Sequence, residues 1–348
     1  MDDPIITFNP NLELLPPEDI GKLQELAHAV ETYRIVATAV ELGVFDALDE
    51  PKTSDELADR LGLQKKITGK FCNALVASGF MQQIDGHFAP TDSSRAFFRK
   101  KSPFYQGNLI NLWNTTRNDR WSHLSEIIRN GPEGYEDGLH GVFDAGFVHA
   151  MAEGAVRGSL QKTIEFMKNY PGFRNVKTML DLGGGHGLYS IAFTQMNPGL
   201  FSTVLDLPSV VKQVTSPMIS TYHADRVTAI PGDFTKDNLG PGYDMVFASD
   251  VLYREKTQMD AILGRVHSSL NNDGIFISKH WHIDDIVRDA TAVYFDLMFS
   301  LAEDTDRVYS SAEFSRTLES NGFEIEKVHD LNTPFHPSRI IVSRKVAR

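Results

Sequence analysis

The stretch Val176-Lys-Thr-Met-Leu-Asp-Leu-Gly-Gly-Gly-His-Gly187 constrains the fold of this chain more than any other feature. An apolar segment runs into a glycine cluster, and Leu188-Tyr-Ser-Ile-Ala-Phe193 continues as a helical pattern. Glycine is required where the backbone turns sharply and lies close to a ligand, because a Cβ atom would block both. The N–H groups at the start of the following helix attract an anionic group. The stretch therefore predicts a strand, a tight turn and a helix that together hold a ligand.

The spacing of the glycines indicates which ligand the turn favours. A dinucleotide-binding turn has the pattern G-x-G-x-x-G, whereas the glycines here alternate at Gly183, Gly185 and Gly187. Asp181 precedes the first of them by two residues, and a carboxylate fits poorly beside a pyrophosphate. The pattern favours a zwitterionic ligand with a carboxylate and an ammonium, such as the methionine end of S-adenosylmethionine. An ordinary tight turn that holds no ligand is the alternative.

Length, charge and cysteine content exclude several classes of protein. The 348 residues are enough for two domains with a core in each. A formal net charge of −12 disfavours nucleic acid or an anionic membrane as a partner. The single cysteine, Cys72, excludes an internal disulfide and offers no metal-ligand cluster, so we expect no metal. No apolar run approaches the roughly 18 residues of a membrane span, and the Met-Asp-Asp-Pro start is unlike a signal peptide. We therefore expect a cytoplasmic protein with no membrane partner.

Residues 1–100 predict a winged-helix-like domain. Its expected elements are a long apolar helix over 17–45, a short helix opened by the capping box Thr53-Ser-Asp-Glu56, a helix over Lys66–Ser78 and a hairpin turned at Asp85-Gly86. Winged helices often bind DNA, but these residues hold ten Lys and Arg against sixteen Asp and Glu, and an acidic module lacks the charge of a DNA-binding domain. The long apolar helix instead needs a partner surface. We expect a dimerisation domain.

Residues 101–170 predict a helical linker rich in aromatic side chains. Three side chains are candidates for the wall of an apolar substrate pocket: Trp113, and Phe147 and Met151, which lie on one predicted helix. His149 lies between the last two, on or near the same wall. Core packing is the alternative for each of these side chains.

Residues 171–348 predict an α/β domain. The predicted strands are 177–182, 201–206, 227–231, 244–249, 274–280, 323–329 and 338–345, and helices separate most of them. Repeated βα units imply a parallel sheet covered by helices on both faces. The last two strands are joined by a proline-containing connection without a helix, which indicates an antiparallel hairpin at the sheet edge. The fold class expected is a Rossmann-like, mostly parallel seven-stranded sheet.

Acidic or polar side chains end the strands of this sheet, where such sheets bind their ligands. The carboxylate of Asp206 can accept hydrogen bonds from both hydroxyls of a ribose. Asp233 suits the amino group of an adenine and Phe234 its ring face, and Ser249 ends the fourth strand. Each acidic strand end could by itself be a helix cap. Together with the first strand, which ends in the glycine turn, they make four compatible ends in order, which favours an adenosine site.

The chain resembles the class I S-adenosylmethionine-dependent methyltransferases, in particular the small-molecule O-methyltransferases with an N-terminal winged-helix dimerisation domain. The resemblance covers nearly the whole chain. It rests on Leu180-Asp-Leu-Gly-Gly-Gly-His-Gly187, Asp206-Leu-Pro208, Gly232-Asp-Phe234, the helix from Phe147 to Met151, Asp296-Leu-Met298, Glu313-Phe314 and Gly322-Phe323.

The resemblance implies a role for most of these residues. Gly183 and Gly185, near Asp181, would approach the methionine moiety of S-adenosylmethionine, and Asp206 with Leu207 would bind the ribose. Gly232, Asp233 and Phe234 would bind the adenine, Ser249 would lie near the cofactor, and Met298 would line the substrate pocket with Trp113, Phe147 and Met151. It also implies that residues 171–348 are the S-adenosylmethionine-binding catalytic domain and that a homodimer forms through the N-terminal domains.

One position departs from the family. The family carries a histidine that removes the proton of the substrate hydroxyl, where this chain has Tyr253 in Val251-Leu-Tyr-Arg-Glu255. The ordinary pKa of tyrosine is about 10, against about 6.5 for histidine, so we expect either a perturbed Tyr253 or a replacement base, for which His280 is the candidate.

The expected function is methyl transfer from S-adenosylmethionine to an oxygen or carbon nucleophile of an apolar, aromatic or cyclic small molecule. An acceptor that is already electron-rich needs less help from a base, since placement supplies most of the effect. The alternatives are another reaction of the same fold, such as decarboxylation or hydroxylation, and a winged-helix regulator that senses a ligand.

Overall fold

A computed structural model of the protein describes residues 21–117, 121–132, 143–284, 290–301, 306–331 and 338–347. The chain divides into two compact units, Met1–Pro103 and Phe104–Arg348. The predicted linker, residues 101–170, therefore groups almost entirely with the C-terminal sheet. None of the helices in these described ranges is both long and apolar enough to cross a membrane.

The N-terminal unit is mainly helical. Its elements are α1 (Gly21–Glu41), α2 (Val44–Ala47), α3 (Ser54–Leu61), α4 (Lys65–Ala77), β1 (Met81–Ile84), β2 (His87–Pro90) and α5 (Asp92–Phe98). The predicted capping box is present, because Thr53 accepts the N–H of Glu56 while the Glu56 carboxylate accepts the N–H of Thr53. Asp85 and Gly86, at φ 49° and 75°, turn the β1–β2 hairpin. The predicted start of the first helix at residues 17–20 lies outside the described residues. Its predicted extension to residue 45 is wrong, because α1 ends at Glu41 and Gly43, at φ 70°, separates it from α2.

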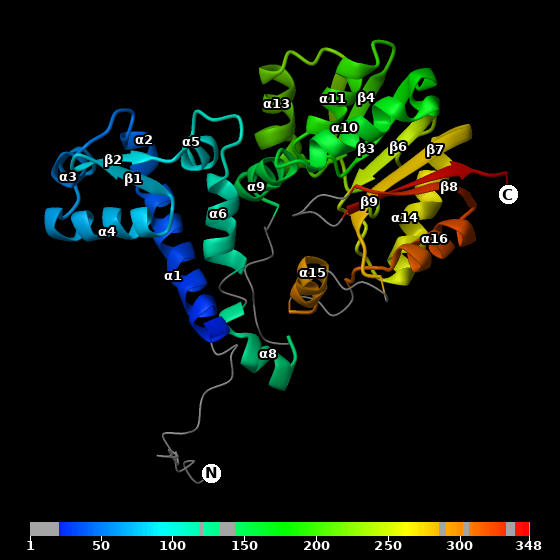
Figure 1. Cartoon of the computed structure of the whole chain (residues 1–348). Coiled ribbons are helices and arrows are strands. Elements are labelled where there is room, and N and C mark those ends of the chain that lie inside the picture. The colour runs from blue at the N-terminus through cyan, green and yellow to red at the C-terminus, as the bar shows by residue number, and fades with distance from the viewer. Residues whose placement is uncertain are drawn as a thin grey trace, which may run out of the picture. The chain divides into compact units, whose positions relative to one another are not determined.

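The C-terminal unit begins with helices and continues as alternating strands and helices (Figure 1). The first part comprises α6 (Gly107–Leu112), η2 (Trp113–Arg117), α8 (Leu124–Asn130), α9 (Ala145–Ala155), α10 (Ser159–Asn169) and η3 (Pro171–Asn175). The second comprises β3 (Thr178–Leu182), α11 (Leu188–Met196), β4 (Phe201–Asp206), α12 (Pro208–Val210), η4 (Val211–Thr215), α13 (Ser216–Thr221), β5 (Val227–Pro231), β6 (Tyr243–Ser249), α14 (Lys256–Ser269), β7 (Leu270–Trp281), α15 (Ala290–Ser300), α16 (Ser311–Ser320), β8 (Phe323–Asp330) and β9 (Ser338–Lys345).

The seven strands form one sheet in the order β5-β4-β3-β6-β7-β9-β8. β3 to β7 pair in parallel, and β9 pairs antiparallel with both β7 and β8. The predicted seven-stranded, mostly parallel fold is confirmed, as is the antiparallel pair at the sheet edge. Residues 332–337 of the connection between β8 and β9 lie outside the described residues.

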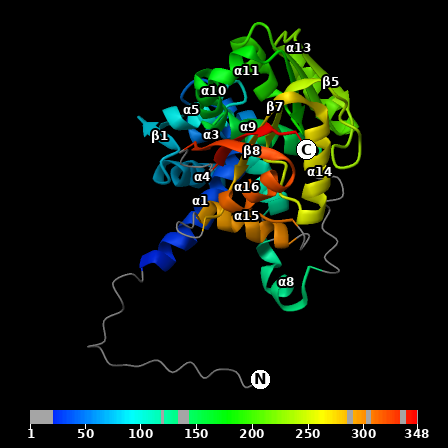
Figure 2. The same ribbon diagram turned by 90° about the vertical axis from the view of Figure 1, so that its right-hand side faces the viewer.

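Successive side chains of each strand enter different cores, because strand residues alternate between the faces of a sheet. Met179, Phe247 and Ile277 pack with residues of α10 and α11 on one face. Leu180, Val246 and Phe276 pack with residues of α14 and α16 on the other. Figures 1 and 2 show these helix layers, with α10 and α11 in green, α14 in yellow and α16 in orange. Helices cover both faces of the central strands, so we expect a ligand of the sheet to bind at the strand ends.

Candidate functional site

The glycine turn after β3 has a backbone conformation that favours glycine, and at Gly183 it is also too closely packed for a side chain. Gly183, Gly185 and Gly187 have φ angles of 63°, 50° and 70°, a backbone conformation that glycine adopts without strain. A Cβ atom on Gly183 would lie 3.0 Å from both Phe234 and Val251. The turn therefore lies directly against the residues that follow β5 and β6.

Asp181 is buried beneath this turn. A Cβ atom on Gly184 would lie 2.5 Å from the carboxyl carbon of Asp181. The Ser190 hydroxyl donates to Oδ2 of Asp181 at 2.6 Å and lies 2.8 Å from the Ser202 hydroxyl. Burial raises the pKa of Asp181 to about 7, although the hydrogen bond from Ser190 opposes the rise. Asp181 can thus change its charge near neutral pH.

Asp206 connects the end of β4 to the glycine turn. Its Oδ2 accepts the N–H of Gly185 and its Oδ1 accepts the N–H of Leu207, each at 2.7 Å. Burial raises the pKa of Asp206, while these two hydrogen bonds lower it. Each carboxylate oxygen has a second lone pair, so Asp206 can hold the turn and still accept hydrogen bonds from a ligand.

The residues after β5 lie next to this pair of strand ends. The N–H of Gly232 donates to the carbonyl of Asp206 at 2.9 Å, and Phe234 packs against the core between the sheet and α14. The Asp233 carboxylate accepts the hydroxyl of Thr235 at 2.6 Å and pairs with Lys236 at 2.9 Å. Its carboxylate therefore has protein partners already, and an adenine would share it with them.

Asp250 and Lys279 form an ion pair that the sequence analysis missed. Nζ of Lys279 lies 2.5 Å from Oδ2 of Asp250, and the Ser249 hydroxyl donates to the same oxygen at 3.2 Å. The Lys279 side chain is 1% exposed and that of Asp250 is 35% exposed. Burial opposes both charges, but their attraction lowers the pKa of Asp250 and raises that of Lys279. A lysine inside the apolar run of β7 was the available sequence signal.

The same ion pair contacts Tyr253, through Asp250, and Tyr189 of α11, through Lys279. The Tyr253 hydroxyl donates to Oδ1 of Asp250 at 2.9 Å and accepts the N–H of Trp281 at 3.0 Å. Nζ of Lys279 lies 5.9 Å from the centre of the Tyr189 ring at the start of α11, within reach of a cation–π interaction. Asp250 has a left-handed backbone, at φ 57°, which non-glycine residues seldom adopt.

His280 lies next to Tyr253 and is buried. Its Nε2 accepts the N–H groups of Val251 and Leu252 at 3.2 and 3.0 Å, so the proton of the neutral ring is on Nδ1. Burial lowers the pKa of His280 to about 3. Nδ1 is buried and has no hydrogen-bond partner among the described residues. These contacts favour a role in holding the 250–252 turn, and the predicted role as a base stays a prediction.

Aromatic side chains of α15 cover Tyr253. The rings of Phe295 and Phe299 each lie 5.2 Å from the Tyr253 ring, centre to centre. Met298 lies on the same helix and is partly exposed. The helix therefore supplies an apolar, partly accessible surface beside the end of β6.

The other predicted pocket residues lie on η2 and α9. Phe147 packs against Val210 and Val214, which follow β4. Met151 is 38% exposed, and the Trp113 ring lies 5.5 Å from the Arg157 guanidinium. α9 also lies over the glycine turn, because a Cβ atom on Gly185 would come within 3.5 Å of Val148. The predicted pocket residues thus come from three elements, and their assembly into one pocket stays a prediction.

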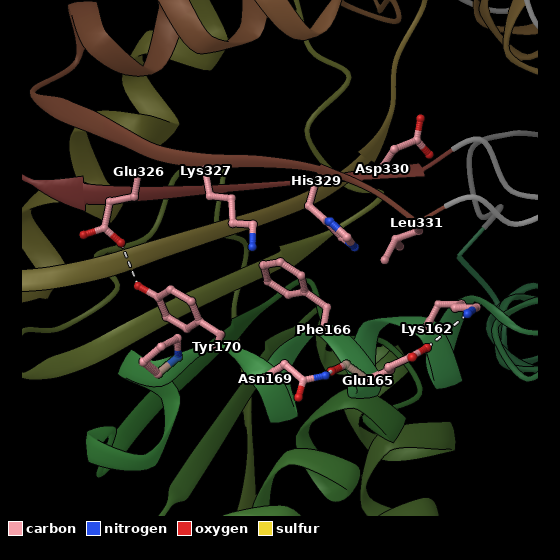
Figure 3. Close-up of a pocket in the computed structure, with 11 residues that line it drawn as sticks. Lys162, Glu165, Phe166, Asn169, Tyr170, Glu326, Lys327, His329, Asp330 and Leu331 are labelled. Carbon is pink, nitrogen blue, oxygen red and sulfur yellow. Dashed lines mark hydrogen bonds and ion pairs between the residues drawn. The ribbon is translucent and has the colours of Figure 1, made fainter.

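A separate groove of about 510 Å³ lies between α10 and β8. Figure 3 shows the Phe166 ring between Tyr170 and His329, with the Lys327 ammonium above it. None of the predicted site residues lines this groove. In the described ranges, no group of three or more His, Cys, Asp or Glu side chains is placed to hold a metal ion.

Comparisons with known proteins give the family context. Residues 121–324 match the sequence model of the O-methyltransferase domain, and residues 24–100 match that of the O-methyltransferase dimerisation domain. An uncharacterized protein of Methanocaldococcus jannaschii is 32% identical over 275 residues, which cover 77% of this chain and 72% of that protein. The tetracenomycin polyketide synthesis 8-O-methyl transferase TcmO of Streptomyces glaucescens is 29% identical over 322 residues, covering 87% and 91%.

The same fold occurs in solved structures. The crystal structure of human N-acetylserotonin methyltransferase in complex with S-adenosylmethionine matches with a TM-score of 0.82 at 21% identity. The match covers 95% of this chain and 99% of the human one. At this identity the likeness concerns the fold alone.

Proposed function

Because this chain belongs to the O-methyltransferase family, we propose that it methylates an oxygen atom of an apolar aromatic or cyclic small molecule. Its class, methyltransferase, and its cofactor, S-adenosylmethionine, follow from that membership. The family model and TcmO both specify oxygen, which favours oxygen over the carbon nucleophile also considered. None of the comparisons reported above supports decarboxylation, hydroxylation or regulation of transcription.

The tight glycine turn and the strand-end carboxylates support the cofactor assignment. The turn has no side chain at Gly183 and Gly185, so a ligand can lie close to its backbone, which suits the methionine end, and Asp181 beneath it suits the ammonium. Asp206 keeps lone pairs for the ribose hydroxyls, with Leu207 beside it.

The adenine end of the cofactor would lie beyond β5 and β6. We assign it to Gly232, Asp233 and Phe234, with Ser249 nearby. When bound, S-adenosylmethionine supplies an electrophilic methyl group on a positively charged sulfur. The residues of this chain hold and orient the two reactants, so that transfer needs little further rearrangement.

The acceptor class is tested by incubation with S-adenosylmethionine labelled in its methyl group and a panel of phenols, hydroxylated polyketides and indoles. We expect label in one or more acceptors together with an equal amount of S-adenosylhomocysteine. A product that carries no label, formed without S-adenosylhomocysteine, would contradict methyl transfer.

We also propose that the protein is a cytoplasmic homodimer and that its N-terminal unit is a winged-helix dimerisation domain. Leu23, Leu26 and Val30 lie on one face of α1 and are 69%, 65% and 64% exposed in the single chain. Leu26 and Val30 lie within the matched dimerisation domain, and Leu23 lies one residue before it. An apolar stripe of this kind favours burial against a second copy.

Leu26→Glu is expected to shift the protein from dimer to monomer, because the charge would have to be buried in the interface. The measurement is the molar mass by size-exclusion chromatography with light scattering. Ile128→Glu is the control, since Ile128 is 70% exposed on α8, outside the matched dimerisation domain. An unchanged dimer in Leu26→Glu would contradict the use of this face.

Cofactor affinity is expected to rise by about tenfold between pH 6 and pH 8. Burial raises the pKa of Asp181 to about 7, so the carboxyl is mostly protonated at pH 6 and mostly ionised at pH 8. Only the ionised form attracts the ammonium, and binding therefore tightens as the pH rises. Calorimetric titration with S-adenosylmethionine measures this effect.

Two variants separate the contribution of Asp181 from other titrations. Asp181→Asn should bind with an affinity that is nearly independent of pH over this range. Ser190→Ala removes the hydrogen bond that lowers the pKa of Asp181. In this variant the rise in cofactor affinity should therefore occur at higher pH. A wild-type affinity that is flat from pH 6 to pH 8 would contradict the placement of the ammonium near Asp181.

A further inference from the structure

We infer that the acceptor is already an anion when it meets the methyl group, and that Tyr253 and His280 form a fixed scaffold and do not remove its proton. This inference rests on the proposed function and narrows its substrate class. It selects acidic acceptors, such as phenols ionised by electron-withdrawing substituents or by a neighbouring carbonyl group, over ordinary alcohols.

The hydrogen bonds of Tyr253 fix its proton. The phenol donates to Asp250 at 2.9 Å, and its oxygen accepts the Trp281 N–H at 3.0 Å. To act as a base, Tyr253 would first have to lose its own proton while facing a carboxylate. Burial and the charge of Asp250 raise the pKa of Tyr253 well above its usual value, which opposes that loss at neutral pH.

The hydrogen bonds of His280 leave no ring nitrogen free to accept a proton. Two backbone N–H groups already point at Nε2, the only ring nitrogen that carries a lone pair in the neutral form. A second proton on the ring would displace those donors and place a charge where the side chain is 1% exposed. The Asp250 charge favours that proton, while burial and the neighbouring Lys279 and His282 oppose it.

The charges next to this scaffold are already paired. Asp250 faces Lys279 and accepts from Ser249 and Tyr253. His282 donates from Nδ1 to the Tyr309 carbonyl at 3.2 Å, and burial lowers its pKa to about 4. His149 on α9 is the competing base, because it is partly exposed on the helix whose Val148 contacts the glycine turn.

If the acceptor is an anion, methyl transfer needs no base, because no proton has to be removed. Its electron pair forms the new bond to the methyl carbon, the carbon–sulfur bond breaks, and that pair stays on sulfur. The negative charge of the acceptor and the positive charge of the sulfonium both disappear. A neutral hydroxyl would also have to release a proton, for which Tyr253 and His280 offer no acceptor.

The first test observes the side chains without requiring turnover. In the dimer labelled with carbon-13 at histidine Cε1 and bound to S-adenosylhomocysteine, we expect the His280 resonance, assigned with His280→Gln, to stay constant from pH 5.5 to 9. Should His280→Gln fail to fold, the resonance is assigned by its nuclear Overhauser contacts to Phe314, whose ring lies 5.7 Å away. A His280 titration with a midpoint between pH 6 and 8 would overturn the inference.

The second test compares an acceptor that the enzyme methylates with an analogue whose pKa is about two units lower. The inflection of kcat/KM against pH should move with the ionisation of the acceptor and should stay in place in Tyr253→Phe. An inflection common to both acceptors that is lost in His149→Gln or Tyr253→Phe would identify an enzyme base and overturn the inference. If no acceptor is methylated, the proposed function fails, while the histidine titration still decides the state of His280.

Discussion

Replacing Asp206 by alanine is expected to weaken S-adenosylmethionine binding by about 100-fold to 10,000-fold. The ribose would lose two hydrogen bonds to a charged acceptor, each contributing roughly 1.5–3 kcal/mol, and each 1.4 kcal/mol corresponds to about tenfold in affinity. The glycine turn would also lose its anchor, because Asp206 accepts the N–H of Gly185 at 2.7 Å. Isothermal titration calorimetry measures the affinity.

Two further variants separate these contributions. Asp206→Asn keeps one acceptor oxygen and should lose less affinity than Asp206→Ala. Asp225→Ala is the matched control, since Asp225 is an exposed carboxylate just before β5, at the end of the strand opposite to Phe234, and should bind as the wild type does. Circular dichroism establishes that the fold persists. Unchanged affinity in a folded Asp206→Ala protein would show that the ribose lies elsewhere.

Asp250→Asn is expected to destabilise the C-terminal unit by about 3–5 kcal/mol at neutral pH. The substitution leaves the Lys279 ammonium without its counter-charge in a place where the side chain is 1% exposed, and an unpaired buried charge has an effect of about this size. For a unit of this length each kcal/mol shifts Tm by about 2–4 °C. Thermal and denaturant unfolding, followed by tryptophan fluorescence, measure the loss.

Replacing Lys279 should destabilise the protein less than replacing Asp250. Lys279→Met leaves a carboxylate that keeps 35% exposure and the hydrogen bonds from Tyr253 and Ser249, so we expect a loss of about 1 kcal/mol. The double variant Asp250→Asn with Lys279→Met should be more stable than Asp250→Asn alone, because no buried charge remains. Equal losses in the two single variants would contradict the asymmetry that burial implies.

The order and type of the main elements could be predicted from local sequence. All seven predicted strands exist within a few residues of their expected bounds. Buried parallel strands are short apolar runs, and the hydrophobic residues of the helices between them recur at three- and four-residue steps, so the two are easily told apart. Thr53 and Glu56 close their predicted capping box, and the Asp85-Gly86 turn forms, since both depend on neighbours a few residues away.

The site could be predicted only in part. The glycines at 183, 185 and 187 already indicated a sharp turn and a close approach of backbone, and all three have positive φ angles. The position of Asp206 at a strand end placed it near the turn, as parallel strands end at the same edge of a sheet. Its two hydrogen bonds to Gly185 and Leu207 were not foreseen, because they depend on how β4 lies beside β3.

The sequence by itself determined the sheet, the glycine turn and the acidic strand ends, all of which follow from patterns within a few residues. Tertiary structure alone decided that Lys279 meets Asp250, 29 positions earlier in the chain, and that two backbone N–H groups point at His280. Burial and pairing across strands set which protons these side chains can gain or lose. A tyrosine at position 253 leaves the choice of base open in the sequence, and only its hydrogen bonds to Asp250 and Trp281 indicate a scaffold.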